Sequence, residues 1–410
     1  FGIWETINGA RPLRQNRTAD RVAQGVDSAT LRHLAAIHRL PVPPHRRIAM
    51  VGGSDDHVGI AVGTTWTAMP RVDTVSDVLE ALRAGEVRAE GQHGSVDKLV
   101  HSGCRIAAHV VADGGHSAAV MDAPIGRLRD ILPLLALLPT PQVRRLVEER
   151  YAQQLASVFA QADSSLGMLG LVVKLSALVD AHLMLAPWLG VSAYFGREAR
   201  KIGEIERLMG YDEQRPIRVG VFVDAIESTH GVSTFYRNVT AATGSDVDLM
   251  LVHAGAAEYG VALTPIGTLP MPLYTDERLA VPSLLQALDV IAGQEFDLVH
   301  VATPGPVGIA AFVAARILGL PVVGAYHTEF GLYAQSISGD AMLGDLVDLL
   351  VRQCCDHCDA VVVPSQSTVE AMARRGYRVD QACVVSNGVD ASLFRPERRD
   401  ESLHQELGGG

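Results

Sequence analysis

The segment from residue 296 to residue 330 constrains the fold more than any other part of the chain. It reads FDLVHVATPGPVGIAAFVAARILGLPVVGAYHTEF, in which two short β-branched runs flank a helical pattern. Such runs are typical of strands in a parallel sheet covered on both faces. The stretch between them opens with Gly305 and Pro306, carries apolar residues at helical spacing and stops at Gly319. The segment therefore predicts a strand, a crossover helix and a second, parallel strand.

The second strand of this unit delivers a histidine to a loop. His327, Thr328 and Glu329 follow the apolar run Pro321 to Tyr326. In parallel α/β sheets, ligands bind beyond the carboxyl ends of the strands. An imidazole there can orient a hydroxyl group or donate to a phosphate oxygen. His327 is therefore the candidate catalytic residue, and Thr328 is a candidate binding residue.

The same alternation of strands and helices covers everything from Arg215 to Pro364. Strands are expected in RPIRVGVFVD, DVDLMLVH, DLVHV, PVVGAY, AVVVPS and ACVVSNGVD. After the first of them, a loop ending at Gly231 precedes a helix that should begin near Val232 or Ser233. Five or six parallel strands are implied, and hence one doubly wound α/β domain.

Six fragments of this region resemble, in order, the amino-terminal half of a retaining glycosyltransferase of family 4 with the GT-B fold. They are VFVDAIESTHGVSTFYRNV, LPMPLYTDERLAVP, DLVHVATPGPVGIAA, VVGAYHTEFGLYA, VVVPSQST and VVSNGVDASLFRP. The family includes bacterial mannosyltransferases and sulfoquinovosyl- or glucosyltransferases that act on lipid or small acceptors. Each fragment alone is a weak signal, but the six in the family's order make the resemblance specific.

The resemblance implies roles for individual residues. Gly231 would lie against the pyrophosphate of a nucleotide-sugar donor, and His327 would contact the transferred sugar or its phosphate. The other candidates for donor or acceptor binding are Val232, Thr328, Tyr333, Ser365, Asn387 and Gly388. Backbone N–H groups at a helix start can stabilise a diphosphate leaving group, and a side chain at position 231 would hold the phosphate away. Without the resemblance, Gly231 is equally well a turn glycine and His327 a histidine bonded to backbone.

The family also implies a donor and a second domain. The donor would be a UDP- or GDP-sugar, gripped mainly by a further Rossmann-like domain that residues 399–410 would begin and that Asn387 to Asp390 would lead into. The 410 residues by themselves are therefore expected to bind a nucleotide-sugar weakly and to turn none over.

A second signal lies near the start of the chain. RRIAMVGGSDDHVGIAVGTTWT reads as a strand followed by Asp55 and His57. On extended backbone, residues i and i+2 face the same way, so these two side chains could bind one divalent metal ion. With GIWETING and VSDVLEALRAGEV, the segment resembles the carboxyl-terminal part of a PHP-type metal-dependent phosphoesterase, a distorted β/α barrel with a multinuclear metal centre. The alternative is a polar loop that caps a helix.

Length and pattern give the domain organisation. A chain of 410 residues exceeds one ordinary core. We expect an α/β protein with a partial PHP-like β/α barrel remnant in residues 1–122, a helical connector in residues 123–212 and the Rossmann-like doubly wound domain, the amino-terminal half of GT-B, in residues 213–398. Within the connector, residues 166–195 are apolar, but Lys174, Asp180 and His182 interrupt them. They fit buried helices or an interfacial membrane contact.

Composition limits the classes of binding partner and the cell compartment that we expect. The net charge of −11 argues against a nucleic-acid partner, whose phosphates would be repelled. It leaves a peripheral contact with a membrane open, since local patches can act against the overall sign. Five cysteines cannot all pair, and the start of the chain does not resemble a secretory signal. We expect the cytoplasm, with peripheral contact to the inner face of the membrane.

These observations favour a retaining glycosyltransferase that moves a hexose from a nucleotide-sugar to a hydroxyl group on a lipid or small glycoside. The first alternative is a PHP-type metal-dependent phosphoesterase. The second is a non-catalytic binding fragment. The sequence leaves the sugar, the nucleotide and the acceptor open.

Overall fold

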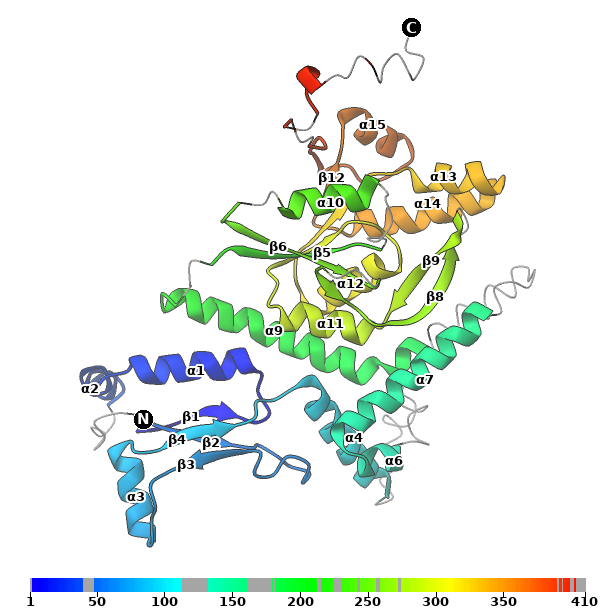
Figure 1. The fold of residues 1–410 in the computed structure, drawn as a ribbon. Helices are drawn as coiled ribbons and strands as arrows, with labels where there is room; N and C mark the ends of the chain where they lie inside the picture. Colours follow the sequence, from blue (N-terminus) through cyan, green and yellow to red (C-terminus); the bar gives the residue numbers. More distant parts are fainter. Residues whose placement is uncertain are drawn as a thin grey trace.

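The computed structural model describes two α/β regions joined by helices (Figure 1). The described residues are 2–39, 48–112, 132–160, 179, 181–211, 215–224, 231–241, 244–255, 259–271, 274–388, 391–392, 394–398 and 402. The larger region is built around a parallel sheet in the second half of the chain. The smaller one contains residues 2–91.

The large sheet has seven strands in the order β13-β12-β11-β10-β5-β6-β7, and every neighbouring pair is parallel. The strands are β5 (Ile217–Phe222), β6 (Val247–His253), β7 (Val261–Ala262), β10 (Leu298–Val301), β11 (Val322–Ala325), β12 (Ala360–Val363) and β13 (Ala382–Val384). The chain runs outward from β5 on one side and outward from β10 on the other. The strand order therefore switches direction between β5 and β10.

The helices of this region are α10 (Gly231–Ala241), α11 (Leu284–Gly293), α12 (Pro306–Leu318), α13 (Phe330–Ser338), α14 (Ala341–Asp356) and α15 (Gln366–Arg374), and a 3₁₀ turn, η3, covers Pro396–Arg398. The predicted doubly wound domain is confirmed, and α10 begins within a residue of its expected start. The expected five or six strands were too few, because the two-residue β7 is too short to leave a pattern. An antiparallel hairpin of β8 (Pro265–Met271) and β9 (Tyr274–Pro282) was not foreseen either.

The smaller region has two pairs of strands. β1 (Ile3–Asn8) is parallel to β2 (Ala49–Gly53), and β3 (Thr65–Ala68) is antiparallel to β4 (Arg88–Gly91). Its helices are α1 (Leu13–Gly25), α2 (Ser28–Ile37) and α3 (Val75–Ala84). In α3, Thr74 and Asp77 form a capping box, which fixes the start of the helix. These strands and helices are compatible with part of a β/α barrel.

The connecting helices are α4 (Val96–Ala112), α6 (Leu132–Leu137), α7 (Thr140–Ala160) and α9 (Ala186–Leu208). Helical structure thus begins before the predicted start of the connector at residue 123. Residues 166–178 and 180 of the apolar stretch 166–195 lie outside the described residues. Among the residues that are described, no helix is long and apolar enough to span a membrane.

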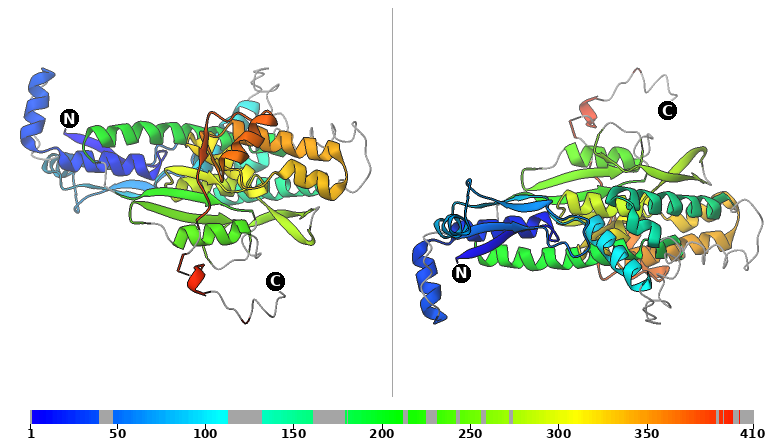
Figure 2. Two further views of the ribbon diagram at one scale, coloured as in Figure 1. Left: turned by 90° about the horizontal axis from the view of Figure 1, so that it is seen from above. Right: turned by 90° about the horizontal axis from the view of Figure 1, so that it is seen from below.

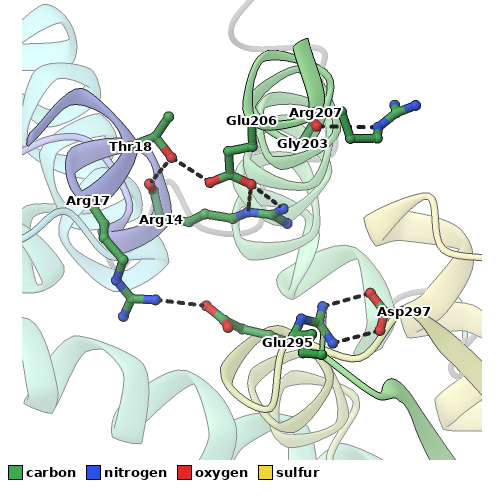
Figure 3. A network of polar contacts seen from close by, with 9 residues as sticks. Arg14, Arg17, Thr18, Gly203, Glu206, Arg207, Glu295 and Asp297 are labelled. Carbon is green, nitrogen blue, oxygen red and sulfur yellow. Dashed lines mark hydrogen bonds and ion pairs between the residues drawn. The ribbon is translucent and has the colours of Figure 1, made fainter. Parts of the chain in front are cut away.

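Helix α9 lies between the two regions (Figures 1 and 2). On one side, its Glu206 accepts hydrogen bonds from Arg14 Nη2 at 2.6 Å and from Thr18 Oγ1 at 2.5 Å, both on α1 (Figure 3). Burial acts to raise the pKa of Glu206, but these hydrogen bonds and the charges of Arg14 and Arg21 together lower the pKa. A longer ion pair, Arg17 to Glu295 at 3.9 Å, also links the regions.

On its other side, α9 packs against the carboxyl end of α12. A Cβ atom on Gly196 would collide with the backbone of Leu318, so only a glycine permits this approach. Arg200 Nη1 donates a hydrogen bond to the Leu318 carbonyl at 2.9 Å. Leu135, Val147 and Trp188 of the connecting helices belong to the same hydrophobic cluster as Phe222 and Leu285. The connector and the large sheet therefore share one core.

Candidate functional site

The point at which the strand order switches carries a buried carboxylate. Asp224 follows β5 and Thr303 follows β10, and Thr303 Oγ1 donates to Asp224 Oδ2 at 2.5 Å. The backbone N–H groups of Gly305 and Val307 donate to the same carboxylate at 3.0 and 2.6 Å. Asp224 thereby caps the start of α12, as a negative charge at a helix N-terminus should. Burial raises its pKa to about 6, although these hydrogen bonds act in the opposite direction.

Gly305 is required for this arrangement. A Cβ atom at that position would lie 2.5 Å from the carboxylate of Asp224. The sequence showed Gly305 only as the opening of a helix, and Asp224 only as the last residue of a predicted strand. Because β5 and β10 are far apart in sequence, only the sheet order reveals that Asp224 and Thr303 meet.

A pocket of about 720 Å³ opens beside Asp224. It is bounded by the starts of α10 and α12, by α13 along its length and by one face of α14. Its lining residues are Asp224, Gly231, Val232, Phe235, Leu279, Thr303, Pro304, Gly305, His327, Thr328, Phe330, Tyr333, Ala334, Ile337, Ser338, Leu343, Val347, Val351 and Asn387. Parallel α/β sheets characteristically bind ligands at such a switch point.

The structure brings most of the predicted site residues to this pocket. Those that line it are Gly231, Val232, His327, Thr328, Tyr333 and Asn387. Gly231 is the first residue of α10, and no atom of the described residues lies within 4 Å of where its Cβ would be. A ligand could therefore reach the helix start closely, as the anion-binding role requires.

Ser365 and Gly388 do not line the pocket. Ser365 is the N-cap of α15, and its hydroxyl accepts a hydrogen bond from the Thr368 N–H at 3.2 Å. That contact explains the serine by helix capping alone. Gly388 follows Asn387 at the end of the segment after β13, where its Cβ position is open. Their assignment as binding residues stays a prediction.

His327 lies in a cluster of rings that the sequence did not reveal. Its Nε2 atom is 3.1 Å from the hydroxyl of Tyr236 on α10, and the same hydroxyl is 2.7 Å from Nε2 of His300 on β10. Phe235 packs against the His327 ring with a centroid distance of 5.4 Å. His327 is therefore both a pocket residue and a bonded member of the domain.

One wall of the pocket is apolar. Helix α13 contributes Phe330, Tyr333, Ala334 and Ile337, and α14 contributes Leu343, Val347 and Val351. Tyr333 and Ile337 are 37% and 45% exposed, so this wall continues to the surface. The pocket thus joins a polar end, with His327 and Asp224, to an apolar end between two helices.

The predicted metal ligands of the smaller region have a different setting. His57 Nε2 lies 3.2 Å from Asp55 Oδ1, and the side chain of His57 is 83% exposed. The two residues meet in a loop after β2, and Asp55 has a positive φ of 47°. Our argument from alternation along a strand was therefore wrong, although the side chains do come together. In the described ranges, no group of three or more His, Cys, Asp or Glu could hold a metal ion.

Comparison with known proteins matches two parts of the chain to two protein families. Residues 231–393 match the family described as Glycosyltransferase Family 4, and residues 44–87 match the family described as PHP-associated. The chain contains a family 4 glycosyltransferase domain. The family 4 match includes every predicted donor- or acceptor-binding residue, and the PHP-associated match includes Asp55 and His57. Both resemblances noted in the sequence are confirmed.

The family 4 domain has named relatives. An alpha-monoglucosyldiacylglycerol synthase of Streptococcus pneumoniae is 28% identical over 142 residues, which are 34% of this chain and 32% of the relative. A GDP-mannose-dependent alpha-mannosyltransferase of Mycolicibacterium smegmatis is 30% identical over 146 residues, or 36% of this chain and 38% of the relative. The chain thus spans about a third of the length of these relatives.

Among solved structures, HepE of Anabaena in complex with UDP-glucose has 17% sequence identity and a TM-score of 0.33. The alignment covers 47% of this chain and 50% of HepE.

Proposed function

We propose that the protein is a retaining glycosyltransferase that moves a hexose from a UDP- or GDP-sugar to a hydroxyl acceptor. The observation that supports this most directly is the pocket at the switch point, in which Gly231 and His327 of the family 4 domain face one cavity. The start of α10 would stabilise the leaving diphosphate, and His327 would contact the sugar or the acceptor. Thr328, Tyr333 and Asn387 complete the polar contacts that we propose.

We propose further that the acceptor has an apolar part, as in a glycolipid or an alkyl glycoside. The apolar wall of α13 and α14 begins next to His327 and reaches the surface at Ile337. Met342, at the start of α14, is 78% exposed. These residues would let a lipid acceptor enter from a membrane surface, which fits a cytoplasmic protein in peripheral contact with the inner leaflet.

The test is an acceptor-dependent release of nucleotide by the full-length gene product. UDP- and GDP-hexoses are each offered with diacylglycerol in vesicles, with an octyl glycoside and with a methyl glycoside. Transfer to the two apolar acceptors, with retained anomeric configuration by NMR, is the expected result. Transfer only to the methyl glycoside would contradict the apolar acceptor. No release with any pair would favour the binding-fragment alternative and contradict the proposed activity.

We also propose that Asp55 and His57 contribute to a divalent metal site of the PHP-associated part. Their donor atoms lie 3.2 Å apart, close enough to share an ion. Catalytic zinc sites use at least three protein ligands, so this pair alone does not complete one, and we assign no chemical step to it. Metal content of the purified protein should fall in Asp55→Ala and stay unchanged in Asp73→Ala. Equal content in both would contradict the site.

A further inference from the structure

An asparagine of the smaller region connects the ends of β1 and β2. Asn8 is the last residue of β1, and its side-chain nitrogen Nδ2 lies 3.2 Å from Oδ2 of Asp55. The same nitrogen lies 2.9 Å from Oε2 of Glu5, which is also on β1. β1 and β2 are parallel and are paired as far as Asn8 and Gly53. Asn8 therefore reaches, from the neighbouring strand, the loop that carries Asp55.

A backbone contact decides which way the amide of Asn8 points. The N–H of Ala10 donates to Oδ1 of Asn8 at 2.9 Å. Because a backbone N–H can only donate, the side-chain atom that faces it is the carbonyl oxygen. The nitrogen of the amide then faces Glu5 and Asp55, whose carboxylate oxygens are acceptors. Asn8 therefore donates one hydrogen bond to each carboxylate.

Asn8 is itself held in place by α1. Its N–H donates to Oδ1 of Asn16 at 3.1 Å, and Nδ2 of Asn16 donates back to the carbonyl of Asn8 at 3.0 Å. Asn16 is 4% exposed, so these contacts are shielded from water. The main chain and the side chain of Asn8 are thus both fixed before the side chain reaches Asp55.

Asp55 is the less constrained partner. Its φ of 47° is uncommon for a residue other than glycine, and its side chain is 36% exposed. Its Oδ1 lies 3.2 Å from Nε2 of His57, whereas its Oδ2 accepts the hydrogen bond from Asn8. An exposed carboxylate otherwise samples several rotamers, and each ordered side chain adds an entropy cost to binding. The contact with Asn8 keeps Oδ1 directed toward His57.

We propose that Asn8 is a positioning residue of the divalent metal site proposed above for Asp55 and His57, on which this role depends. It holds Asp55 so that Oδ1 and His57 Nε2 can contact one ion. The carbonyl oxygen of Asn8 is bonded to Ala10, so Asn8 acts through Asp55 and not as a ligand. Loss of a group that hydrogen-bonds a metal ligand typically lowers metal affinity about 10–100-fold.

Two substitutions separate this role from the turn that Asn8 also makes. Asn8→Ser keeps an oxygen that can accept from the N–H of Ala10, as serines do in such turns, but its side chain is too short to reach Asp55. Asn8→Ala loses both contacts. Mn²⁺ is titrated into the metal-free full-length gene product and followed by electron paramagnetic resonance, because this ion prefers carboxylate to thiolate ligands.

The site is defined as the Mn²⁺ binding that Asp55→Ala removes. Its Kd should rise about 10–100-fold in Asn8→Ser and in Asn8→Ala alike. The melting temperature of the metal-free protein should fall clearly in Asn8→Ala alone. A wild-type Kd in Asn8→Ser would overturn the role of Asn8 and leave the metal site standing. Should Asn8→Ala not fold, Asn8→Ser alone gives the answer.

Thr74→Ala is the matched control for stability. Thr74 is the N-cap of α3 in the same region and bonds with Asp77. Its loss should lower the melting temperature and leave the Kd for Mn²⁺ unchanged. An equal rise of Kd in Thr74→Ala and Asn8→Ser would mean that Asn8 acts on stability alone, which would overturn the proposal.

A crystal structure of metal-free Asn8→Ser tests the positioning without any ion. Oδ1 of Asp55 should leave hydrogen-bonding distance of His57 Nε2, and an unmoved Asp55 would overturn the proposal. Wild-type protein that binds Mn²⁺ no more tightly than Asp55→Ala would overturn the metal site itself, and the role of Asn8 with it. The two failures are thus distinguished by whether the wild type binds the ion.

Discussion

His327 and His57 each follow a strand, and their surroundings differ sharply. His327 follows β11 in the large sheet, where Tyr236, Phe235 and a pocket surround it. His57 follows β2 in the smaller region, where its side chain is 83% exposed and pairs with Asp55. His327 was selected from sequence because it follows a buried strand, and His57 because it lies two residues from Asp55 after another strand. The structure places more groups that could act together in binding or catalysis around His327 than around His57.

The difference comes from the sheets that carry the two strands. β11 has a parallel neighbour on each side, so the ends of β5, β10 and β11 converge on one cavity. β2 pairs only with β1 in the described part of the chain, and Asn8, the last residue of β1, donates a hydrogen bond to Asp55 near its end. A histidine after a strand is therefore informative about function when neighbouring strands end beside it.

The largest expected difference between the two histidines is in transfer. In the full-length gene product, His327→Ala should lower kcat by about 10²–10³, the scale of losing one preorganised hydrogen-bonding group. His57→Ala should leave transfer unchanged, because its side chain faces solvent in the other region. Rates are compared per folded molecule, with melting temperatures from the same preparations. A sharp fall in melting temperature with kcat preserved would make His327 a structural residue and would remove the contrast.

A comparable contrast in stability is expected between two aspartates that follow strands. Asp224→Ala leaves the Thr303 hydroxyl and the N–H groups of Gly305 and Val307 without their acceptor. The free energy of unfolding in urea should fall by about 3 kcal/mol, as for other buried donors that lose a charged partner. Asp55→Ala, in an exposed loop, should change it by less than about 0.5 kcal/mol. Similar values for the two variants would contradict our description of the switch point.

The buried histidines should also make stability depend on pH. The folded-state pKa of His300 is lowered to about 4 from 6.5, so its contribution is complete above pH 6.5 and is lost as pH falls toward 4. Asp224, with its pKa raised to about 6, acts in the opposite direction over the same range. Between pH 7.5 and pH 5, His300→Gln should therefore lose about 2 kcal/mol less unfolding free energy than the wild type. If the unfolding free energies of the two proteins, measured in urea, fall by the same amount between pH 7.5 and pH 5, His300 does not make stability depend on pH in this way.

The smallest effect concerns the contact that joins the two regions. Glu206→Gln removes the charge that pairs with Arg14, and we expect a loss of about 1 kcal/mol. The matched control is Glu149→Gln, whose partner Arg145 is 80% exposed, with an expected change of about 0.3 kcal/mol or less. Thermal unfolding of both variants gives the comparison. If the two losses are equal, the charge on Glu206 does not help to hold the regions together.

Much of the larger region was predictable because its signals are local. The strand, helix and strand between residues 296 and 330 follow from β-branched runs, Gly305 and Gly319, and the structure reproduces them. His327 was found because the end of a strand is visible in sequence. Its partners were not, since Tyr236 is 91 residues away and His300 reads as an ordinary core position. The β8–β9 hairpin was missed because the sequence from residue 265 to residue 282 contains no tight-turn dipeptide such as Asn-Gly.

The close contact at Gly196 couples the position of α9 to that of α12. One hydrogen atom in place of a methyl group lets α9 rest on the last turn of α12, and Arg200 fastens the two helices there. Helix α12 is about 20 Å long, and its opposite end is capped by Asp224 at the floor of the pocket. The other side of α9 is held by α1 through Glu206. A tilt of α9 would thus move α12. Through α9 and α12, a movement of the smaller region would reach the pocket.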